Sequence, residues 1–331
     1  MKAVRLYAAG DLRVEEIAAA PAPADGEVRL RVERAGICGS DLHNFKTGMW
    51  ISRSPSVPGH EFVAVVEAAG AGACLAPGTR VVADSRVVCG RCAACLAGES
   101  FHCENLGFVG EVNDGGFEPY TTLPAAQLVA LPDQGLAADV AVLAEPMAVA
   151  LHAVARLNPA TGVPILVAGA GPIGTLVATA LVHRGYGPVM LADRNAARLA
   201  TAAAASGALP VADLAVLPHV PGYAVDATGS PAAVSALLEV LPGGGRIALV
   251  GLFHGAPQVP LNAVVEKGLD VVGCAAFRDE LPAALALLGE VRERVAALTG
   301  RPIALDDVPA TYAELMAGAS DRIKAVIDPF R

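Results

Sequence analysis

The chain has 331 residues, of which 54% are hydrophobic and 17% are charged. This length allows two domains of ordinary size, and the composition excludes a disordered chain. The net charge is −9 and the pI is near 5.3. Nucleic-acid binding needs a basic face, which such an acidic chain is not expected to have, so we predict no nucleic-acid partner.

Membrane insertion has to be considered because the mean hydropathy is +0.50. The longest uncharged stretch, Pro164 to Val182, is long enough to span a bilayer, but glycines and a proline interrupt its first half. We interpret it as a strand, a turn and a helix. The charged N-terminus lacks the apolar core of a signal peptide. We therefore expect no membrane partner and a cytoplasmic location, where thiols stay reduced and clustered cysteines bind metal.

The first 145 residues or so consist of short β segments separated by glycine and proline, which predicts a β-rich domain. Examples of these segments are Val28–Glu33, Glu61–Ala69 and Thr79–Ala83.

Four of the seven cysteines, Cys89, Cys92, Cys95 and Cys103, follow with the spacing C-x2-C-x2-C-x7-C. Three thiols two residues apart, and a fourth on a segment that folds back, can surround one ion tetrahedrally, and thiolates in that geometry suit Zn²⁺. Four protein ligands leave no open position, so this zinc would be structural.

From residue 164 the pattern changes to alternating strands and helices. The predicted strands are Ile165–Ala168, Val189–Ala192, Tyr223–Asp226, Arg246–Gly251 and Leu269–Gly273, and the predicted helices are Pro172–Arg184, Ala196–Ser206 and Pro231–Leu241. Such alternation indicates an α/β fold with a doubly wound parallel sheet. The tail contains a helical stretch from Leu281, strands at Ile303–Leu305 and Ile323–Ile327, and a helix near Tyr312–Ala317.

A glycine motif, G-x-G-x-x-G, opens the first of these helices at Gly169, Gly171, Pro172, Ile173 and Gly174. It follows an apolar strand, and Asp193 ends the next strand, as a dinucleotide site requires. The pyrophosphate would lie on the helix N-terminus. Asp193 can accept hydrogen bonds from the ribose hydroxyls and would repel a 2′-phosphate, which favours NAD(H) over NADP(H). Arg194 beside it could instead hold a phosphate, and a glycine-rich turn that binds nothing is the alternative.

Four further residues are candidate metal ligands or neighbours of a metal, namely Cys38, His60, Glu61 and Glu145. Taken singly, each has an ordinary explanation as a core residue or as part of a helix start. Together with the cysteine cluster and the glycine motif they resemble the zinc-dependent medium-chain dehydrogenase/reductase family. The similarity is greatest to its polyol branch of sorbitol, butanediol, threonine and sugar-acid dehydrogenases, and it covers essentially the whole chain. It implies a GroES-like catalytic domain of residues 1–147 and 281–331 with both zinc sites, and a Rossmann NAD-binding domain of residues 148–280.

The resemblance also implies roles for the isolated residues. Cys38, His60 and Glu145 would ligate a catalytic zinc, Glu61 would stand beside it or enter coordination transiently, and the cysteine cluster would hold a second zinc. Three protein ligands leave a position for substrate, whose hydroxyl the zinc polarises. Ser40 and His43 match the family's relay, which carries the alcohol proton to solvent.

Cofactor contacts are implied at further positions. Val149 lies one helical turn after Glu145, where the family packs the nicotinamide ring. Two strands of the predicted sheet end at further candidate contacts, namely Thr228 and the run Val250, Gly251 and Leu252. The alternative is that these residues form ordinary turns that contact no cofactor.

The substrate residues are less specific. Phe277 and Arg278 resemble a pair that polyol dehydrogenases place over the substrate, and a surface ion pair of Arg278 at a helix start is the alternative. Asn44 stands where sorbitol enzymes have a tyrosine, which argues against sorbitol itself. Trp50, the only tryptophan, would line the pocket or anchor a loop.

We therefore predict a zinc-dependent NAD(H) oxidoreductase that oxidises a secondary alcohol of a polyol, sugar acid or related hydroxylated small molecule to a ketone. The first alternative is an amino-alcohol, aminocyclitol or threonine-type dehydrogenase. The second is a non-catalytic zinc- and NAD-binding sensor. The family further implies a homo-oligomer, a dimer or tetramer, joined at the sheet edge that the strand Leu269–Gly273 forms.

Overall fold

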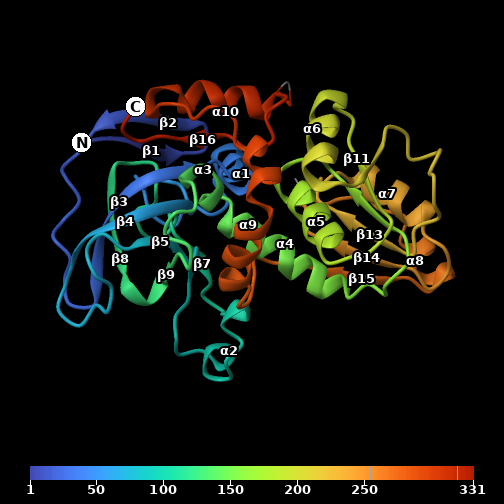
Figure 1. Cartoon of the computed structure of the whole chain (residues 1–331), viewed down its shortest axis with the longest axis horizontal. Coiled ribbons are helices and arrows are strands. Elements are labelled where there is room, and N and C mark those ends of the chain that lie inside the picture. The colour runs from blue at the N-terminus through green and yellow to red at the C-terminus, as the bar shows by residue number, and fades with distance from the viewer. Residues whose placement is uncertain (254, 319) are drawn as a thin grey trace.

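The structure is a computed structural model, and it describes residues 1–253, 255–318 and 320–331. Two bodies lie side by side, each built around a six-stranded sheet (Figure 1). The sheet of the first body is antiparallel and that of the second is parallel, which confirms the predicted change of pattern along the chain.

The antiparallel sheet has the strand order β16-β3-β4-β5-β9, with β8 also paired to β3. Its strands are β3 (Glu27–Gly36), β4 (Glu61–Ala69), β5 (Arg80–Ala83), β8 (Tyr120–Pro124), β9 (Leu128–Ala130) and β16 (Val326–Ile327). A separate hairpin is formed by β1 (Lys2–Ala8) and β2 (Asp11–Glu16), and a small ladder by β6 (Arg86–Val87) and β7 (Gly107–Phe108). Alternate residues of β3, including Val28, Leu30 and Val32, are wholly buried, as a sheet with one face on a core requires. Because β16 pairs with β3, the C-terminus returns to the first body.

The parallel sheet has the order β12-β11-β10-β13-β14-β15. Its strands are β10 (Ile165–Ala168), β11 (Val189–Ala192), β12 (Leu209–Val211), β13 (Tyr223–Asp226), β14 (Arg246–Leu249) and β15 (Asp270–Gly273), and its helices are α5 (Pro172–His183), α6 (Ala196–Ser206), α7 (Pro231–Val240) and α8 (Leu261–Lys267). All residues of β10 and β11 are buried, as expected where helices cover both faces of a sheet. The strand order reverses at β10, so a crevice for a ligand is expected at the carboxyl ends of β10 and β13.

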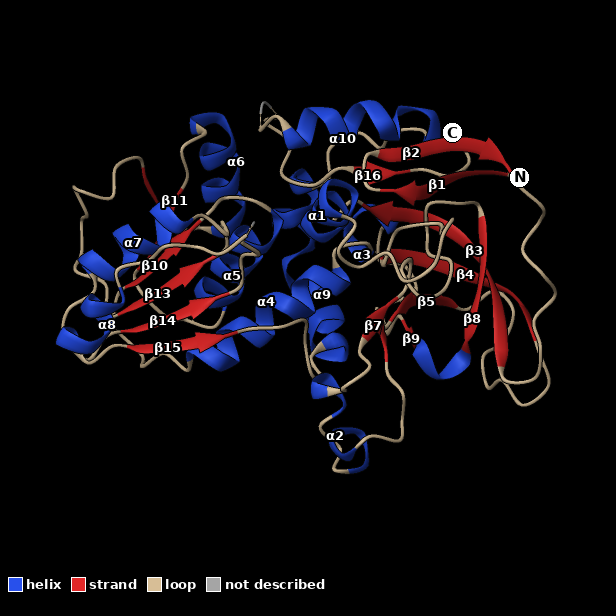
Figure 2. Ribbon diagram, turned by 180° about the vertical axis from the view of Figure 1, so that it is seen from behind, coloured by secondary structure: helices blue, strands red, loops and turns tan. Residues whose placement is uncertain are grey.

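Two long helices lie between the sheets, α4 (Ala144–Leu157) and α9 (Leu281–Val295), and they contact each other (Figure 2). The stretch Ala138–Leu157, which joins α3 (Ala138–Ala141) to α4, is long and apolar enough to cross a membrane. Because 83% of its apolar window is buried inside the protein, it is the core helix that links the two bodies. The other stretch considered for a membrane, Pro164 to Val182, contains β10 and most of α5, so its interpretation as strand, turn and helix is confirmed.

Three helices position the site. They are α1 (Gly39–Thr47), α2 (Ala93–Leu96) and α10 (Val308–Met316). The segment that carries α2 projects away from both sheets, at the bottom of Figure 1. We call this segment, residues 88–106, the cysteine lobe.

The tail differs from the prediction. Ile303 makes only a single bridge to Ile327, and a 3₁₀ turn at Leu305–Asp307 replaces the rest of the predicted strand. The turn is favoured because the Asp307 carboxylate accepts a hydrogen bond from the Ala304 amide. The final strand is confined to Val326–Ile327. Sequence analysis also missed β12, whose central proline is tolerated because the strand lies at the sheet edge.

Candidate active site and metal centres

Cys38, His60 and Glu61 form one candidate metal centre, because their ligand atoms all lie within 4.8 Å of one another. Cys38 caps the N-terminus of α1, His60 precedes β4, and Glu61 is the first residue of β4. The pairing of Gly36 with Glu61 at the end of the β3–β4 ladder brings the two segments together. A Cβ atom at Gly36 would overlap the ends of the Glu61 and Lys324 side chains, so a larger residue there would displace this pair.

Glu145 lies in the first turn of α4 and is 7% exposed. Its Oε1 accepts a hydrogen bond of 2.8 Å from the Ser85 hydroxyl. It lines the same cavity as Cys38 and His60, but among the described residues the close group of ligand atoms contains Glu61 and not Glu145. The structure thus brings the three predicted ligands Cys38, His60 and Glu145 to one cavity, and Glu61 also lies beside Cys38 and His60.

The carboxylate of Asp41 and the hydroxyl of Ser40 flank the His60 ring. Asp41 Oδ1 lies 3.5 Å from His60 Nδ1, while Asp41 Oδ2 accepts a 2.8 Å hydrogen bond from the Cys38 amide. Ser40 Oγ lies 3.4 Å from His60 Nε2. Burial disfavours a charged imidazole, but the neighbouring Asp41 and Cys38 raise the pKa of His60 well above its usual value. These contacts fix the orientation of the ring.

Lys324 forms a buried ion pair with Glu61, and each side chain is 1% exposed. It comes from the segment just before β16, so the C-terminal tail completes the centre. Burial alone would lower the pKa of Lys324, but Glu61 and Cys38 raise it. Leaving either partner alone would place an unpaired charge in the core, which is strongly unfavourable.

The donors at this centre fit a zinc ion. A thiolate, an imidazole and a carboxylate are the ligands of catalytic zinc sites. Burial raises the pKa of the Cys38 thiol, and it raises the pKa of Glu145 to about 7. A divalent cation would offset both effects, because it favours the ionised form of each group.

The second candidate metal centre is the cysteine lobe. The four sulfur atoms of Cys89, Cys92, Cys95 and Cys103 lie within 4.8 Å of one another. The amides of Cys89 and Asn105 donate to Cys103 Sγ at 3.3 and 3.4 Å. Backbone N–H groups of Arg91 and Cys92 lower the pKa of Cys89 to about 6, which favours the thiolate that a metal needs. The predicted four-cysteine arrangement is thus assembled in the fold.

A cavity of about 650 Å³ joins the first candidate centre to the parallel sheet. Its lining includes residues of the first centre and their neighbours, namely Cys38, Ser40, His43, Trp50, His60 and Glu145. It also includes the predicted cofactor contacts, namely Val149, Ile173, Thr228, Val250, Gly251 and Leu252. The rings of His43 and Trp50 pack with centroids 4.8 Å apart. The structure therefore brings ligands, relay residues and cofactor contacts into one cavity of a size that suits a bound small molecule.

The glycine motif has the geometry that a pyrophosphate requires. Gly169 has φ +102°, and a Cβ at Gly174 would overlap the Gly169 carbonyl, so the helix packs directly on the strand. Gly171 is the N-cap of α5, and a Cβ there would meet nothing within 4 Å. Open space therefore lies at the helix N-terminus, where an anion binds.

Asp193 follows β11, and its Oδ2 accepts a 2.7 Å hydrogen bond from the Ala170 amide inside the glycine motif. Its Oδ1 lies 2.8 Å from the Arg198 guanidinium. Burial opposes ionisation of Asp193, but hydrogen bonds from Arg198, Asn195 and Ala170 lower its pKa overall. Arg194 is exposed. The acidic group is thus held beside the motif, and Arg198 rather than Arg194 is the arginine that contacts it.

Three of the four predicted substrate residues do not reach the large cavity. Phe277 is wholly buried beneath the Arg86 guanidinium, which lies 4.5 Å from the ring centroid. Arg278 is 47% exposed and pairs with Glu99 of the cysteine lobe at 2.9 Å, which matches the surface ion-pair alternative. Asn44 accepts a 2.9 Å hydrogen bond from the Trp50 amide and therefore shapes the loop. Among the four, Trp50 alone is a cavity residue in the described part of the chain.

Sequence analysis missed several residues of the site. The candidate ligands are held by Ser85, Asp41 and Lys324. The cavity is also lined by Lys46, Leu106, Phe108, Glu111, Cys274 and Met316. These residues come from loops, helix ends and the short strand β7, and they form no spacing pattern. Lys324 alone had a signal, since a lysine between Ile323 and Ala325 interrupts an apolar run that predicts a buried strand.

Known families and proteins match the chain over most of its length. The family model "Alcohol dehydrogenase GroES-like domain" matches residues 24–133, and "Zinc-binding dehydrogenase" matches residues 172–290. An L-threonine 3-dehydrogenase of Anaeromyxobacter dehalogenans is 36% identical over 76% of this chain and 77% of its own length. The enzyme of the same name from Stenotrophomonas maltophilia is 33% identical over 82% and 84%.

Solved structures agree with these relatives. The 2R,3R-butanediol dehydrogenase of Bacillus subtilis has a TM-score of 0.86 and 28% identity, with 99% of both chains covered. A zinc-binding dehydrogenase of Sinorhizobium meliloti, solved with NADP, has a TM-score of 0.90 and 27% identity over 99% of both chains.

The chain belongs to the zinc-dependent medium-chain dehydrogenase/reductase family. Within that family it is a zinc-dependent alcohol dehydrogenase, an oxidoreductase that uses a nicotinamide cofactor and acts on a small-molecule substrate.

Proposed function

We propose that Cys38, His60 and Glu61 hold the catalytic zinc and that Glu145 faces the zinc from α4. The chain then oxidises the secondary alcohol of a small hydroxylated molecule to a ketone and transfers hydride to NAD. The observation that supports this proposal best is the shared cavity, whose lining combines Cys38, His60 and Glu145 with Val149, Thr228 and Val250. A nicotinamide held against Val149, Thr228 and Val250 would share this cavity with the substrate.

Zinc at this centre would polarise the substrate hydroxyl and lower its pKa. Ser40 would accept the proton, and this is supported by its hydroxyl, which lies beside His60 and lines the cavity. His43, in the next turn of α1, would then take the proton onward. Asp41 keeps the His60 ring oriented, and Lys324 keeps Glu61 from swinging away.

A second zinc would be held by the cysteine lobe, with a structural role because four thiolates close the site. Two zinc ions per chain follow. The pair Arg278–Glu99 ties the lobe to the segment before α9. Loss of this zinc would first loosen the lobe and only then disturb catalysis.

NAD is the proposed cofactor in preference to NADP. The Asp193 carboxylate, held by Ala170 and Arg198, can accept hydrogen bonds from the adenosine ribose and would repel a 2′-phosphate. The exposed Arg194 has the opposite tendency, which makes a direct comparison of the two cofactors necessary.

The domain division follows the two sheets, with residues 1–147 and 281–331 in the catalytic domain and residues 148–280 in the cofactor domain. The pairing of β16 with β3 supports the return of the tail. The edge strand β15 carries Val271, which is 43% exposed, and a homo-oligomer in which this edge pairs with a second copy would cover it.

A threonine-type activity is the second candidate, and the curated relatives at 32–36% identity favour it, since they are named L-threonine 3-dehydrogenases. A substrate panel tests the proposal. The zinc-loaded protein is mixed with NAD or NADP and with vicinal diols, sugar acids and hydroxy amino acids, and the absorbance of the reduced cofactor is followed. We expect turnover with NAD. A protein that binds zinc and NAD but reduces neither cofactor with any alcohol would contradict it.

A further inference from the structure

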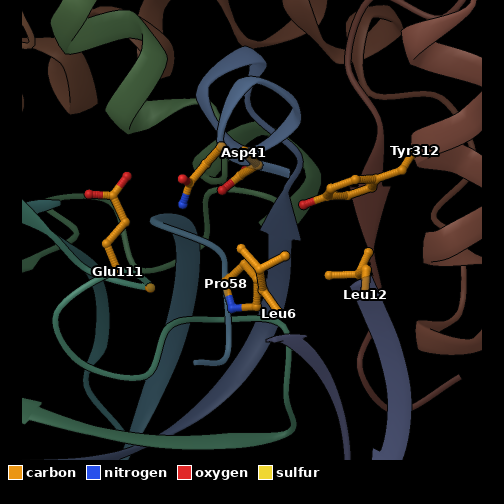
Figure 3. A pocket seen from close by; sticks show the side chains of 8 residues that line it. Leu6, Leu12, Asp41, Pro58, Glu111 and Tyr312 are labelled. Carbon is orange, nitrogen blue, oxygen red and sulfur yellow. The ribbon is translucent and has the colours of Figure 1, made fainter. Parts of the chain in front are cut away.

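Glu111 stands out among the cavity residues because, in the part of the chain that the structure describes, its carboxylate forms no ion pair. It lines the large cavity together with His60, and it also lines a small neighbouring cavity with Asp41 and Tyr312. Figure 3 shows Glu111 and Tyr312 on opposite sides of that small cavity. Among the described residues, no side chain or amide donates a hydrogen bond to the Glu111 carboxylate, and no cation pairs with it.

The backbone around Glu111 is held firmly, so its side chain is presented in a defined place. The Glu111 amide donates to the Phe108 carbonyl at 3.0 Å, and the Glu111 carbonyl accepts from the Ser52 hydroxyl at 2.9 Å. Gly110 has φ +87°, and a Cβ there would press on the backbone of Pro58 and Gly59. The loop therefore packs directly on the segment that leads into His60, which places Glu111 near the reacting end of the cavity.

The surroundings of Glu111 favour a cation over a neutral or anionic group. Burial, opposed in part by His60 and reinforced by Asp41, raises the pKa of Glu111 to about 7. A partly dehydrated carboxylate gains most from a charge-assisted hydrogen bond, which is stronger than one from a neutral hydroxyl. A carboxylate or phosphate on the substrate would instead be repelled.

We propose that Glu111 forms a cation subsite beside the catalytic centre and that the substrate is a vicinal amino alcohol, whose ammonium group pairs with this carboxylate. The proposal rests on the proposed function, since the oxidised carbinol must reach the Cys38–His60–Glu61 centre while the amine on the next carbon reaches Glu111. Glu111 here determines specificity and takes no part in hydride transfer.

A matched series of three substrates tests the subsite. The compounds 1-amino-2-propanol, 1,2-propanediol and lactate share one secondary carbinol and differ in the charge of the group beside it. With the zinc-loaded enzyme and NAD, we expect kcat/KM to fall in that order. In Glu111→Gln the preference for the amine over the diol should fall by about tenfold or more, the usual size of a lost charge-assisted contact, and Glu111→Asp should restore part of it.

A binding measurement keeps the test independent of turnover. Propylammonium lacks the hydroxyl, so its affinity for the zinc- and NADH-loaded protein, measured by calorimetry, reports on the subsite alone. We expect about tenfold weaker binding in Glu111→Gln than in the wild type. The control is Glu293→Gln, an exposed carboxylate on α9 that lies outside the cavity. Unchanged NADH affinity in all variants shows that the cavity is still formed.

The outcomes separate the two proposals. If the wild type oxidises alcohols without preferring the amine, or if Glu111→Gln keeps the preference, the subsite is wrong and the proposed function stands. If no alcohol is oxidised, the proposed function fails, and propylammonium binding still decides for or against the subsite.

Discussion

Four cysteines from one loop make the candidate metal centre of the cysteine lobe, whereas the proposed catalytic centre takes Cys38 from one segment and His60 and Glu61 from another. The lobe centre projects from the molecule, and Leu96 beside it is 77% exposed. The catalytic centre is buried, and Asp41, Ser85 and Lys324 support its acidic and imidazole groups. A closed set of identical ligands needs little help from the fold, while an open and mixed set depends on many contacts behind it.

This difference predicts that the two centres fail in different ways. Removing a ligand from the catalytic centre should abolish chemistry and leave the fold. Removing a ligand from the lobe should weaken the fold and leave the chemistry of the remaining folded molecules.

The largest effect is expected for Cys38→Ser. Loss of this thiolate weakens the hold on the catalytic zinc, whose effect on the reacting hydroxyl amounts to several kcal/mol, so kcat/KM should fall roughly 10³-fold or more. Steady-state kinetics and zinc content measure the change. Cys74→Ser, an exposed cysteine outside both centres, should keep wild-type activity. Normal turnover in a Cys38→Ser protein with zinc only in the lobe would contradict the assignment.

The second effect concerns stability and is expected for Cys95→Ser. Three thiolates cannot close the lobe around zinc, so the free energy of unfolding should drop by about 3 kcal/mol, or roughly 6–12 °C in Tm. Differential scanning fluorimetry measures the drop, and chelator treatment should shift the wild type in the same direction. A Cys95→Ser protein as stable as the wild type would show that the lobe needs no metal.

A third and smaller effect tests the cofactor side of the cavity. Asp193→Ser removes the carboxylate that repels a 2′-phosphate and frees Arg198, its partner at 2.8 Å. The ratio of kcat/KM with NAD to that with NADP should fall by about tenfold. Asp213→Ser, a substitution at an exposed position away from the motif, is the matched control. An unchanged ratio would remove Asp193 from cofactor selection.

The fourth effect concerns the pH dependence of stability and involves a buried carboxyl group outside both candidate metal centres. Glu118 is 3% exposed in the same body as the catalytic centre, and burial and Asp114 raise its pKa to about 8. A raised carboxyl pKa means that the fold prefers the protonated form. Its stabilisation is full below the unfolded value of about 4.5 and is lost as pH rises through about 8. Glu118→Gln imitates the protonated form and should escape this loss.

Urea unfolding between pH 5 and pH 9 measures this difference. We expect the wild type to lose stability relative to Glu118→Gln by on the order of 4 kcal/mol across that window. Glu293→Gln should follow the wild type at every pH. Parallel curves for the wild type and Glu118→Gln would mean that Glu118 remains charged in the fold.

The sequence predicted the features whose residues are neighbours in the chain. The cysteine spacing, the glycine motif and the strand–helix alternation each depend on local geometry, so β10, β11, α6 and β13 begin and end at the predicted residues. The catalytic centre could be predicted only from the combination of scattered residues with the family resemblance.

The remaining features depend on contacts between distant segments. Glu61 takes its place beside Cys38 because Gly36 pairs with Glu61 and Lys324 arrives from the tail. Arg278 leaves the cavity because Glu99 of the lobe attracts it, and Glu111 enters the cavity because Gly110 packs on Pro58. A single residue with no spacing pattern gives no local signal of such contacts.

The most direct test of the division between the two centres is anomalous diffraction at the zinc edge, combined with kcat, for the wild type and Cys95→Ser. We expect two zinc peaks in the wild type. In Cys95→Ser we expect one peak, at Cys38, His60 and Glu61, with kcat per folded molecule within about twofold of the wild type. A folded Cys95→Ser protein that keeps this catalytic zinc and yet transfers no hydride would contradict the division.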